Sequence, residues 1–442
     1  MNTINVNFNK TTGTIKPMHA VNNGPVGDDI GEQIKTNVET YRAAKIPYAR
    51  NHDASFWSDY GGEHTVDVHA IFPDFNKNPY NPDSYDFIPT DDYLKSINDV
   101  GTEVFYRLGT KIEHGRRKYG SIVPADFKKW AVIVEHIIRH YTEGWANGFN
   151  YKITYWEIWN EPDGKTAKGD QPNWSGTAEE FYEFYEVVAT HLKKRFPHLE
   201  IGGPSMSGLN VDWLENFLTH LTEDGKRITL DFFSWHSYYY DPYTVTERSK
   251  RAREILDKYG YTETKMFLNE WNYLENWTDK FVSSIEGIIG MRGAAYTSAF
   301  MALGQKSEVD MLMYYDARPG SSFNGMFDFY TLRPLKGYYP FVMFSKLYEL
   351  KNEAESQSDD KELFVAAAGN DDEKAIMITY FSTDKEAPGK DITVNIQGGA
   401  DGEWVCARLD AEHTMDEEIL EVKNGTAKIS IPHESVLLIS KR

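Results

Sequence analysis

The chain has little of several features that would assign it to a specialised class of protein. Cys406 is its only cysteine, so no intramolecular disulfide can form. It has no apolar run of about eighteen residues, the length typical of a membrane-spanning helix. Met1–Phe8 lack the basic and apolar regions of a secretory signal peptide. We therefore expect a cytoplasmic protein, although an exported protein without its signal peptide would look the same.

Positive charge is also scarce. The chain has 47 lysines and arginines against 67 aspartates and glutamates, and its net charge is −20. Such a surface repels phosphate backbones and anionic lipid, so neither nucleic acid nor a membrane is an expected partner. The sequence leaves the oligomeric state open, and an oligomer is possible.

The 442 residues are enough for a large domain and a smaller one. Between about residues 15 and 345, short apolar runs alternate with amphipathic helices, which is typical of parallel strands joined by helical crossovers. Eight such units predict a (β/α)₈ barrel over residues 15–348. The expected strands are Ile15–Ala20, Ile46–Arg50, Glu103–Leu108, Tyr151–Trp159, Leu199–Gly203, Leu230–His236, Lys265–Glu270 and Val309–Tyr315.

Local signals mark some of the helices and loops between these strands. Pro124 is expected to open one helix, and Thr177–Glu180 is a capping box that predicts the start of another. The longest loop is expected at Asp53–Tyr85, which is rich in Asn, Pro, Asp and Gly.

The pattern changes after about residue 350. Short alternating runs separated by Gly, Asn and Asp predict an antiparallel β-sandwich over residues 349–442. Ile4–Phe8 could add a strand, so residues 1–14 are expected to join this domain. The expected strands are Leu363–Ala368, Ala375–Phe381, Asp391–Ile396, Trp404–Leu409, Ile419–Val422, Ala427–Ile431 and Val436–Ser440.

Two apolar runs end in a carboxylate. Tyr155–Asp163 contains Glu161, Phe267–Asn272 contains Glu270, and each Glu follows an Asn and lies near a Trp. A barrel presents its reactive groups at the carboxyl ends of its strands, so these two side chains are expected to meet there. Two carboxyl groups are what glycoside hydrolysis requires. A lone Glu after a strand is usually a helix cap or a solvated charge, but two in the same context favour chemistry.

Two other features resemble functional groups but favour structural roles. Glu157 lies on the same strand as Glu161 but deeper, so we expect a barrel-interior charge paired with an Arg or Lys. His136 and His140 have the spacing of helical zinc ligands. Because their helix already has an apolar face, surface or packing roles are favoured.

Several blocks, in order, resemble clan A glycoside hydrolases, and most of all glycoside hydrolase family 39. The resemblance extends over nearly the whole chain, and its most specific element is the Trp-Asn-Glu-Pro motif at Trp159–Pro162. The matching segments are Ala49–His52, Tyr155–Pro162, Ile201–Pro204, Asp231–Tyr238, Leu268–Trp271 and Arg333–Tyr339.

The resemblance implies a retaining mechanism with Glu270 as the nucleophile and Glu161 as the acid/base. Glu161 must then start protonated near neutral pH, and apolar walls and a neighbouring carboxylate would raise its pKa. Arg50 and Tyr238 match positions that contact the nucleophile and would keep it ionised.

The resemblance also implies a set of substrate-binding residues. Asn160 matches the residue that donates to the sugar 2-hydroxyl, with a strand-end capping amide as the alternative. Trp271 either packs against the nucleophile or stacks on the sugar. The implied substrate-binding residues are Arg50, His52, Asn160, His236, Tyr238 and Trp271.

The third and eighth strands depart from the family pattern. Val104–Lys111 does not end in the Glu that the family usually has there, and Met313–Arg318 contains no Trp. Both departures fall where sugar hydroxyls are read, so Arg107, Lys111 or Arg318 could select an acidic or differently oriented sugar.

We expect a retaining, exo-acting glycoside hydrolase with no metal and no cofactor. Its partner would be an oligosaccharide or glycoside, with a β-xyloside first. The alternatives are an arabinosidase, galactosidase or glucosidase of the same mechanism, a non-catalytic carbohydrate-binding protein on the same scaffold, or a metal-dependent hydrolase.

Overall fold

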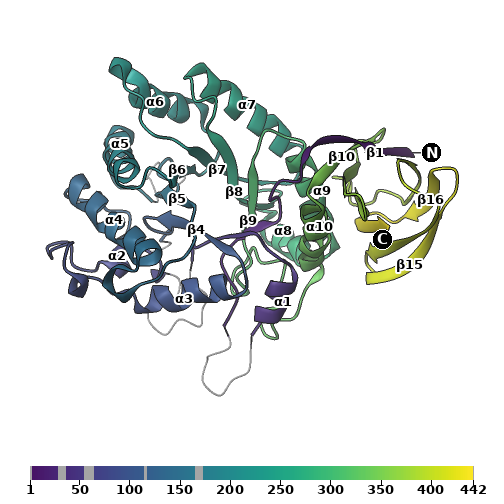
Figure 1. Cartoon of the computed structure of the whole chain (residues 1–442), viewed down its shortest axis with the longest axis horizontal. Coiled ribbons are helices and arrows are strands. Elements are labelled where there is room, and N and C mark those ends of the chain that lie inside the picture. Colours follow the sequence, from purple (N-terminus) through teal and green to yellow (C-terminus); the bar gives the residue numbers. More distant parts are fainter. Residues whose placement is uncertain (1, 28–35, 54–63, 114–116, 165–172, 442) are drawn as a thin grey trace.

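The computed structural model describes residues 2–27, 36–53, 64–113, 117–164 and 173–441 (Figure 1). A closed barrel of eight parallel strands occupies the first part of the chain, and each strand pairs with the next in sequence. The barrel strands are β2 (Ala20–Asn22), β3 (Tyr48–Arg50), β4 (Glu103–Leu108), β5 (Tyr155–Ile158), β6 (Glu200–Met206), β7 (Phe232–Tyr239), β8 (Lys265–Tyr273) and β9 (Met311–Tyr314).

The predicted (β/α)₈ barrel is confirmed, but its first strand begins later than expected. The prediction placed that strand at Ile15–Ala20, whereas β2 starts at Ala20. Pro17 interrupts the predicted segment and has no backbone N–H to give to a neighbouring strand. The apolar character of Ile15 instead comes from packing, because this residue is buried in the main core.

Helices surround the barrel and follow its strands in turn. None of the described helices is both long enough and apolar enough to cross a membrane. The α-helices are α1 (Val38–Ala43), α2 (Val68–Ile71), α3 (Ile88–Asp99), α4 (Phe127–Glu143), α5 (Ala178–Arg195), α6 (Val211–Thr222), α7 (Thr244–Lys258), α8 (Phe281–Ile288), α9 (Met291–Gln305) and α10 (Tyr339–Leu350). Short 3-10 helices are η2 (Pro82–Ser84), η3 (Trp145–Asn147), η4 (Glu223–Gly225) and η5 (Lys336–Tyr338).

Side-chain caps define the starts of α4 and α5. The capping box predicted at Thr177–Glu180 is confirmed, with both reciprocal hydrogen bonds formed. The start predicted at Pro124 is wrong, because α4 begins at Phe127 after Asp126, whose side chain accepts from the Lys129 N–H at 3.0 Å. A carboxylate cap satisfies an amide of the first turn, which a proline cannot do.

The segment predicted as one long loop, Asp53–Tyr85, includes two short helices in the part that the structure describes. They are α2 and η2, and Asn81 caps η2 by accepting from the Asp83 N–H. Residues 54–63 lie outside the described part of the chain. The Asn and Pro residues that suggested a loop also suit the first turn of a short helix.

The barrel interior is built in layers. An apolar layer at the amino ends of the strands contains Phe105, Phe232 and Phe267, with Tyr155 packed against it. Two residues further along their strands, Glu157 and Asn269 form a polar layer, because inward-facing residues recur every second position. The apolar layer closes one end of the barrel, so the chemistry-bearing groups collect at the other end.

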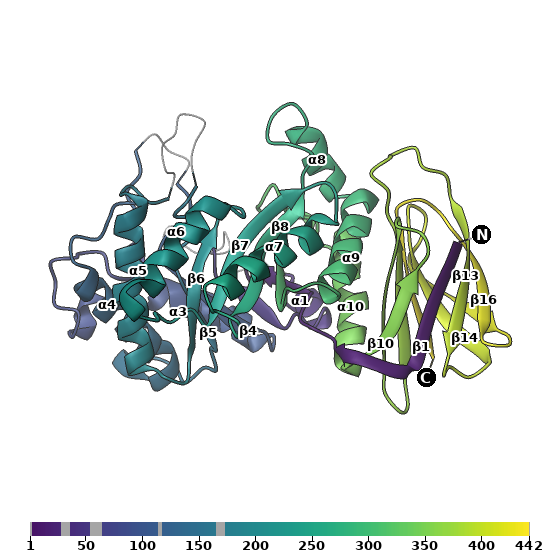
Figure 2. The ribbon, with the colours of Figure 1, turned by 90° about the horizontal axis from the view of Figure 1, so that it is seen from above.

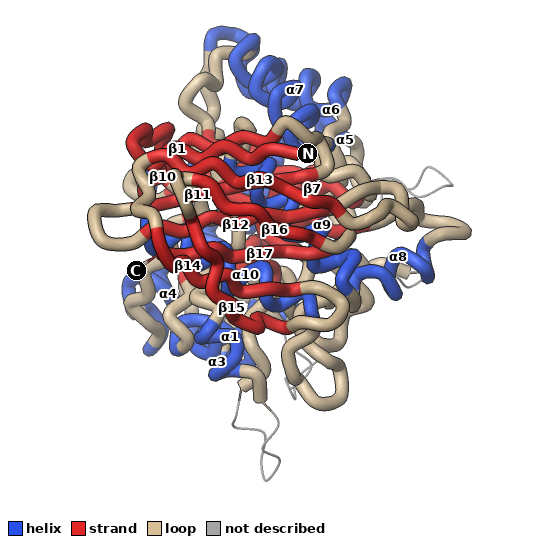
Figure 3. The backbone as a smooth tube through the Cα atoms, turned by 90° about the vertical axis from the view of Figure 1, so that its right-hand side faces the viewer, coloured by secondary structure: helices blue, strands red, loops and turns tan. Residues whose placement is uncertain are grey.

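The rest of the chain forms a nine-stranded sheet, seen face-on in Figure 3. Its order is β15-β14-β17-β12-β11-β10-β1-β13-β16, and all neighbours are antiparallel except β1 and β13. The edge strands β15 and β16 are joined by a tight turn, so the sheet must curl until its edges meet, which gives the predicted sandwich. The strands are β1 (Asn2–Thr14), β10 (Asn352–Ser358), β11 (Leu363–Gly369), β12 (Lys374–Tyr380), β13 (Lys390–Gln397), β14 (Gly402–Leu409), β15 (Thr414–Val422), β16 (Thr426–Ile431) and β17 (Ser435–Lys441).

One strand of this sheet, β10, was not predicted. Its sequence, NEAESQS, has a single fully buried residue, Ala354, and no apolar alternation. It pairs with β1 and β11, so backbone hydrogen bonds to both neighbours define it rather than its side chains.

The sheet packs on the barrel through α9 and α10, which lie between the two (Figure 2). Along β11, Phe364 and Ala366 belong to the core shared with the barrel helices, whereas Leu363 and Val365 belong to a second core inside the sandwich. This alternation buries both faces of β11. The helix α9 is buried almost all round, which is why its sequence shows no amphipathic pattern.

Candidate active site

A cavity of about 730 Å³ opens at the carboxyl ends of the barrel strands. Its wall includes both predicted carboxylates, Glu161 and Glu270. The same wall also includes His52, Lys111, Ser207, Tyr238, Trp277, Tyr315 and Arg318.

The backbone turns sharply where β5 ends. Trp159 and Glu161 adopt positive φ angles of 77° and 47°, a region that non-glycine residues rarely occupy. Two hydrogen bonds to neighbouring strands hold this turn: the Trp159 N–H donates to the Leu108 carbonyl, and the Glu161 N–H donates to the Ser205 carbonyl, each at 2.7 Å. The strained turn directs Glu161 into the cavity, and strain of this kind is concentrated at functional sites.

The two predicted carboxylates meet in this cavity. A carboxylate oxygen of Glu161 lies within 4.8 Å of one of Glu270, and a ring nitrogen of His236 lies within the same distance of both. The Nδ1 of His236 contacts Glu161 Oε1 at 2.6 Å and Glu270 Oε2 at 3.4 Å. Strands four and seven of the barrel therefore deliver their carboxyl groups to one point.

Glu270 is contacted by a guanidinium, a phenol and an imidazole. Arg50 Nη1 contacts its Oε1 at 2.8 Å, the Tyr238 hydroxyl donates to its Oε2 at 2.9 Å, and His52 Nε2 lies 3.2 Å from Oε1. Burial raises the pKa of the Glu270 carboxyl, and the neighbouring imidazole, guanidinium and phenol oppose that rise. The predicted contacts of Arg50 and Tyr238 with this residue are both present.

Glu161 has much less support for a negative charge. Among the described residues, the Glu161 carboxyl group has one hydrogen-bond partner, His236 Nδ1. Burial raises the pKa of Glu161 to about 7, against the weaker opposing effect of Arg50. Close to neutral pH this carboxyl group therefore retains a proton for a substantial fraction of the time.

Arg50 is the centre of the polar layer beneath the cavity. It is fully buried and binds Glu157 at 2.7 Å as well as Glu270. Burial alone would lower the pKa of Arg50, but the two carboxylates raise it. Glu157 also accepts from Ser234 at 2.6 Å and from Asn269 at 2.5 Å. The prediction that Glu157 is a barrel-interior charge paired with a basic residue is thus confirmed.

The side-chain amide of Asn160 has hydrogen bonds at its oxygen but not at its nitrogen. Its Oδ1 accepts from Arg50 Nη2 at 2.7 Å and from the Ser205 hydroxyl at 3.3 Å. Its Nδ2 is buried and has no hydrogen-bond partner among the residues that the structure describes. Because the carbonyl end is fixed by Arg50, the amide N–H groups are held ready for a hydroxyl acceptor.

His236 links the acid end of the site to the polar layer. Its Nε2 lies 2.7 Å from the Ser205 hydroxyl, which in turn accepts from Arg50 at 2.9 Å. Burial lowers the pKa of His236 to about 4, so the ring is neutral at pH 7. Sequence reasoning missed Ser205, because nothing marks a serine after Gly202–Pro204 as part of a site until the barrel closes.

Comparison with known proteins identifies the family. The model for "Glycosyl hydrolases family 39" matches residues 64–418, well over half of the chain. The chain belongs to this family.

Among curated relatives, a β-xylosidase from Geobacillus stearothermophilus is 27% identical over 168 residues, which are 34% of this chain and 32% of that protein. The match thus spans about a third of the relative's length. Among solved structures, a glucosidase from Croceicoccus marinus has a TM-score of 0.81 at 22% identity, covering 100% of this chain and 98% of that one. A β-xylosidase from Caulobacter crescentus has a TM-score of 0.70 at 16% identity, covering 100% and 99%. At these identities the two structures share the fold.

The prediction that Trp271 binds substrate needs correction. This side chain is fully buried, and its ring stacks on Phe300 of α9 at a centroid distance of 4.3 Å. Alternation along β8 sends Glu270 inward, so its neighbour points outward to the helices. Of the two roles left open, the structure supports packing and not stacking on a sugar. A register shift between Leu268 and Trp271 also allows both Asn269 and Glu270 to face inward.

The departures from the family pattern form a charged cluster beside the cavity. Lys111 Nζ lies 2.9 Å from Asp53 Oδ1, the Tyr315 hydroxyl donates to Asp53 Oδ2 at 3.1 Å, and Arg318 lies 3.9 Å from the same oxygen. His52 Nδ1 contacts Asp53 Oδ2 at 3.0 Å. These neighbours, with Arg318 and His52 foremost, hold the pKa of Asp53 well below its usual range despite its burial. Arg318 also lies 3.7 Å from Asp316, so two carboxylates face the two cations, which weakens the case for an acidic sugar here.

Sequence reasoning overlooked Asp53. It lies immediately after the Ala49–His52 motif, in a segment that reads as the start of a polar loop. An acidic residue directly after a motif histidine was the available signal, because a carboxylate commonly orients an imidazole.

Arg107, the third basic residue considered for sugar selection, does not line the cavity. It is fully buried, pairs with Asp67 at 2.6 Å and donates to the His52 carbonyl at 2.5 Å. Arg107 therefore holds the backbone of a cavity residue and does not contact a sugar.

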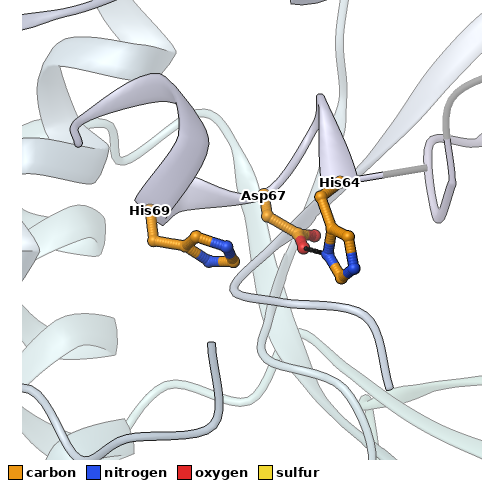
Figure 4. A group of neighbouring side chains, drawn as sticks. All are labelled: His64, Asp67 and His69. Atoms are coloured by element: carbon orange, nitrogen blue, oxygen red, sulfur yellow. Dashed lines mark hydrogen bonds and ion pairs between the residues drawn. The ribbon is translucent and has the colours of Figure 1, made fainter. Parts of the chain in front are cut away.

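A second histidine and carboxylate group lies near this ion pair. His64, Asp67 and His69 each place one potential metal-ligand atom within 4.8 Å of the others, and the two imidazole rings flank the carboxylate (Figure 4). Asp67 already binds Arg107, and its Oδ2 lies 2.8 Å from His64 Nδ1. A metal ion would have to share Asp67 with a buried guanidinium, so these residues fit an ion-pair network better than a metal centre.

His136 and His140 have packing roles, as expected. His136 Nδ1 bonds the Val132 carbonyl at 2.8 Å, one turn back along α4. His140 stacks on Phe87 at 3.6 Å and contacts Asp91 at 3.0 Å. The ring nitrogens of the two histidines thus bind different partners. The zinc-like spacing in the sequence does not correspond to a metal site.

Proposed function

We propose that this protein is a retaining glycoside hydrolase that removes a terminal sugar residue. The observation that supports this most is that Glu161 and Glu270 line one cavity and bring a carboxylate oxygen of each within 4.8 Å of the other. Retaining enzymes hold their carboxyl groups about 5–5.5 Å apart, whereas inverting enzymes leave room for a water molecule between them.

In the first step Glu270 attacks the anomeric carbon and forms an ester bond to it. The bond from that carbon to the leaving oxygen breaks, and Glu161 gives its proton to this oxygen. In the second step Glu161 takes a proton from water, whose oxygen attacks the anomeric carbon and releases Glu270 as a carboxylate. Both residues return to their starting protonation states.

The contacts of the two residues suit these roles. Arg50 and Tyr238 stabilise a negative charge on Glu270 before attack and after release. The raised pKa of Glu161, about 7, keeps a proton available for the leaving group. Esterification of Glu270 removes a nearby negative charge, so the pKa of Glu161 falls when it has to act as a base.

Asn160 is proposed to donate to the sugar 2-hydroxyl. Its Nδ2 lacks a partner among the described residues, and Arg50 fixes the orientation of its amide. A hydrogen bond at this hydroxyl strengthens as the anomeric carbon gains positive charge.

A β-xyloside is the proposed substrate, on the basis of the curated β-xylosidases among its relatives. Exo action is proposed because the charged cluster around Asp53 places His52, Lys111 and Arg318 in the cavity wall that also contains Glu270. A terminal sugar would bind there. Buried groups of opposite charge suit the hydroxyls of a neutral sugar, each of which both donates and accepts.

A panel of aryl glycosides, with the first anomer formed followed by proton NMR, tests the proposal. We expect cleavage of the β-xyloside and a β-configured initial product. Activity restricted to arabinosides, galactosides or glucosides would overturn the xyloside assignment. An α-configured first product would overturn retention, and binding without turnover across the panel would favour the non-catalytic alternative.

We also propose a division into two domains. Residues 15–348 would form the catalytic barrel, and residues 349–442 with residues 1–14 the sandwich. The support is that the sandwich has its own hydrophobic core, which β1 joins through Ile4 and Val6. Separate expression of the barrel is not expected to succeed, because it would expose the faces of α9 and α10 that the sheet covers.

A further inference from the structure

A second hollow lies beside the catalytic cavity, between the ends of β6 and β7 and the helix α7. Its volume is about 620 Å³. Ser207, Tyr238 and Trp277 line both spaces, so the hollow continues the catalytic cavity. We call it the α7 groove, and the polar residues of its wall that bear on binding are Asp163, Ser207, His236, Glu247, Arg248 and Arg251.

The α7 groove adjoins the acid/base end of the site. His236 lies in its wall and contacts Glu161 at 2.6 Å. Asp163, two residues beyond Glu161, also lies in this wall and binds the Ser207 N–H at 2.8 Å. The proton donor stands beside the leaving group, so whatever is attached to the leaving oxygen extends toward this groove.

The opposite end of the catalytic cavity has a different character. His52, Lys111 and Tyr315 line the catalytic cavity but not the α7 groove, and they gather around Asp53 near Glu270. The end near Asp53 is thus the space for the terminal sugar, and the α7 groove is the space for the leaving group.

Two arginines, one helical turn apart, face the α7 groove. Arg248 is half-buried, donates to the Ser237 hydroxyl at 2.9 Å and forms no salt bridge with any described residue. Arg251 is exposed, and its nearest carboxylate contact, with Glu254 of the same helix, is a long one of 3.5 Å. Such a pair of weakly compensated guanidinium groups is unexpected in a chain of net charge −20.

The acidic groups in the groove only partly offset these charges. Glu247 is exposed on the first turn of α7. Burial raises the pKa of Asp163 to about 7, so its carboxyl group carries only part of a charge near neutral pH. The groove therefore retains a positive balance beside the leaving-group position.

We propose that the α7 groove binds a carboxylate on the leaving-group side of the substrate, as in an acidic saccharide. Arg248 and Arg251 are the specificity-determining residues, since a guanidinium matches a carboxylate with two parallel hydrogen bonds. The inference rests on the proposed glycosidase function and names the class of its substrate. It differs from the acidic-sugar hypothesis for Lys111 and Arg318, which concerns the terminal sugar.

The test uses two aryl glycosides of the sugar that the enzyme cleaves best, with 3-carboxyphenyl or 3-carbamoylphenyl as the leaving group. The two differ in charge but little in shape. We expect kcat/KM to favour the carboxylate by about 10-fold, the value of a charge-assisted hydrogen bond. This ratio should fall toward one in the Arg248→Gln, Arg251→Gln double variant and partway in Arg251→Gln alone.

Lys250→Gln is the matched control. Lys250 lies between the two arginines on α7, is exposed and does not line the groove. This variant loses one unit of charge from the same helix, as Arg251→Gln does, so a ratio unchanged from the parent protein would assign the effect of Arg251→Gln to the groove and not to the general field. An equal fall in Lys250→Gln, or a parent ratio of one, would overturn the proposal.

Calorimetric binding of the same two glycosides to Glu270→Ala protein separates this inference from the proposed function. If the parent protein hydrolyses no glycoside but the Glu270→Ala protein binds the carboxylate form more tightly, the catalytic proposal fails and the groove stands. If the parent protein hydrolyses glycosides normally but the carboxylate and carbamoyl glycosides bind equally to Glu270→Ala protein, with or without the two arginine substitutions, the groove proposal fails alone.

Discussion

Glu161 and Glu270 lie at the same end of the same barrel, and their surroundings differ in one main respect. Glu270 is contacted by a guanidinium, a phenol and two imidazoles, whereas Glu161 has the neutral ring of His236. Burial acts on both, and its effect on Glu161 is opposed only by the more distant Arg50. Identical side chains acquire different proton affinities through the number of donors that face them.

The position of Arg50 explains the difference. Its guanidinium lies at the end of β3, between Glu157 below and Glu270 above. Glu157 and Glu270 therefore share one buried cation, whereas Glu161, the third carboxyl group, has no direct contact with it. The predictions below break or sharpen this contrast, in decreasing order of expected effect.

Glu270→Ala should reduce kcat/KM on aryl glycosides by on the order of 10⁴-fold or more, as loss of a nucleophile does in other hydrolases. Azide should restore part of the activity and give a glycosyl azide of inverted configuration, because the small anion fits the vacated space. Product analysis by NMR measures this. Rescue with retained configuration would contradict the role of Glu270.

Glu161→Ala should act selectively. On natural glycosides we expect a loss of about 10²–10⁴-fold, the contribution of a general acid. The first step with an activated leaving group, such as a dinitrophenolate, should be nearly unaffected, because that group needs no proton. Burst-phase kinetics distinguishes the two steps, and Glu161→Gln protein with full activity on natural substrate would contradict the assignment.

Arg50→Met should destabilise the fold by about 3–5 kcal/mol, because it leaves Glu157 as a buried charge without its cation. Urea unfolding measures the free energy. Arg139→Met is the control, since Arg139 pairs with Glu143 at 3.1 Å on the partly exposed face of α4 and such pairs contribute about 0–1 kcal/mol. Equal effects of the two changes would contradict the central role of Arg50.

The pH dependence of kcat/KM should report Glu161. Its pKa of about 7 lies above its ordinary value of 4.5, so the protonated acid is present below pH 7 and is lost as the pH rises through 7. We expect activity on natural glycosides to fall about tenfold per pH unit on the basic side. Glu161→Ala should lack this limb, and a limb that persists in the variant would have to belong to another group.

Trp271→Phe should change kcat/KM least, by less than about threefold, while lowering stability by about 1–2 kcal/mol through lost packing on Phe300. Comparing KM for a xyloside in the two proteins provides the measurement. A large rise in KM with unchanged stability would restore the stacking role that the structure argues against.

Much of the fold was predictable because its signals are local. Apolar runs located seven of the eight barrel strands, and Thr177–Glu180 located a helix start, since periodicity and caps act over a few residues. The strand β10 was not predictable, because its polar side chains carry no pattern and its partners lie far away in sequence. The direction of Trp271 depended on the register of β8, which the sequence did not reveal.

The sequence by itself determined that two carboxylates lie near the carboxyl ends of two strands of one barrel, because each motif lies within a few residues. It also determined, through Trp159–Pro162 and the other blocks, the family to which the chain belongs. The resemblance implied that Glu161 keeps a proton, but only the tertiary structure supplied the physical cause, since that depends on Arg50, Ser205 and His236 meeting across three strands. It alone brought Asp53, Lys111 and Arg318 together and joined the α7 groove to the cavity, because side chains distant in sequence meet only when the barrel closes.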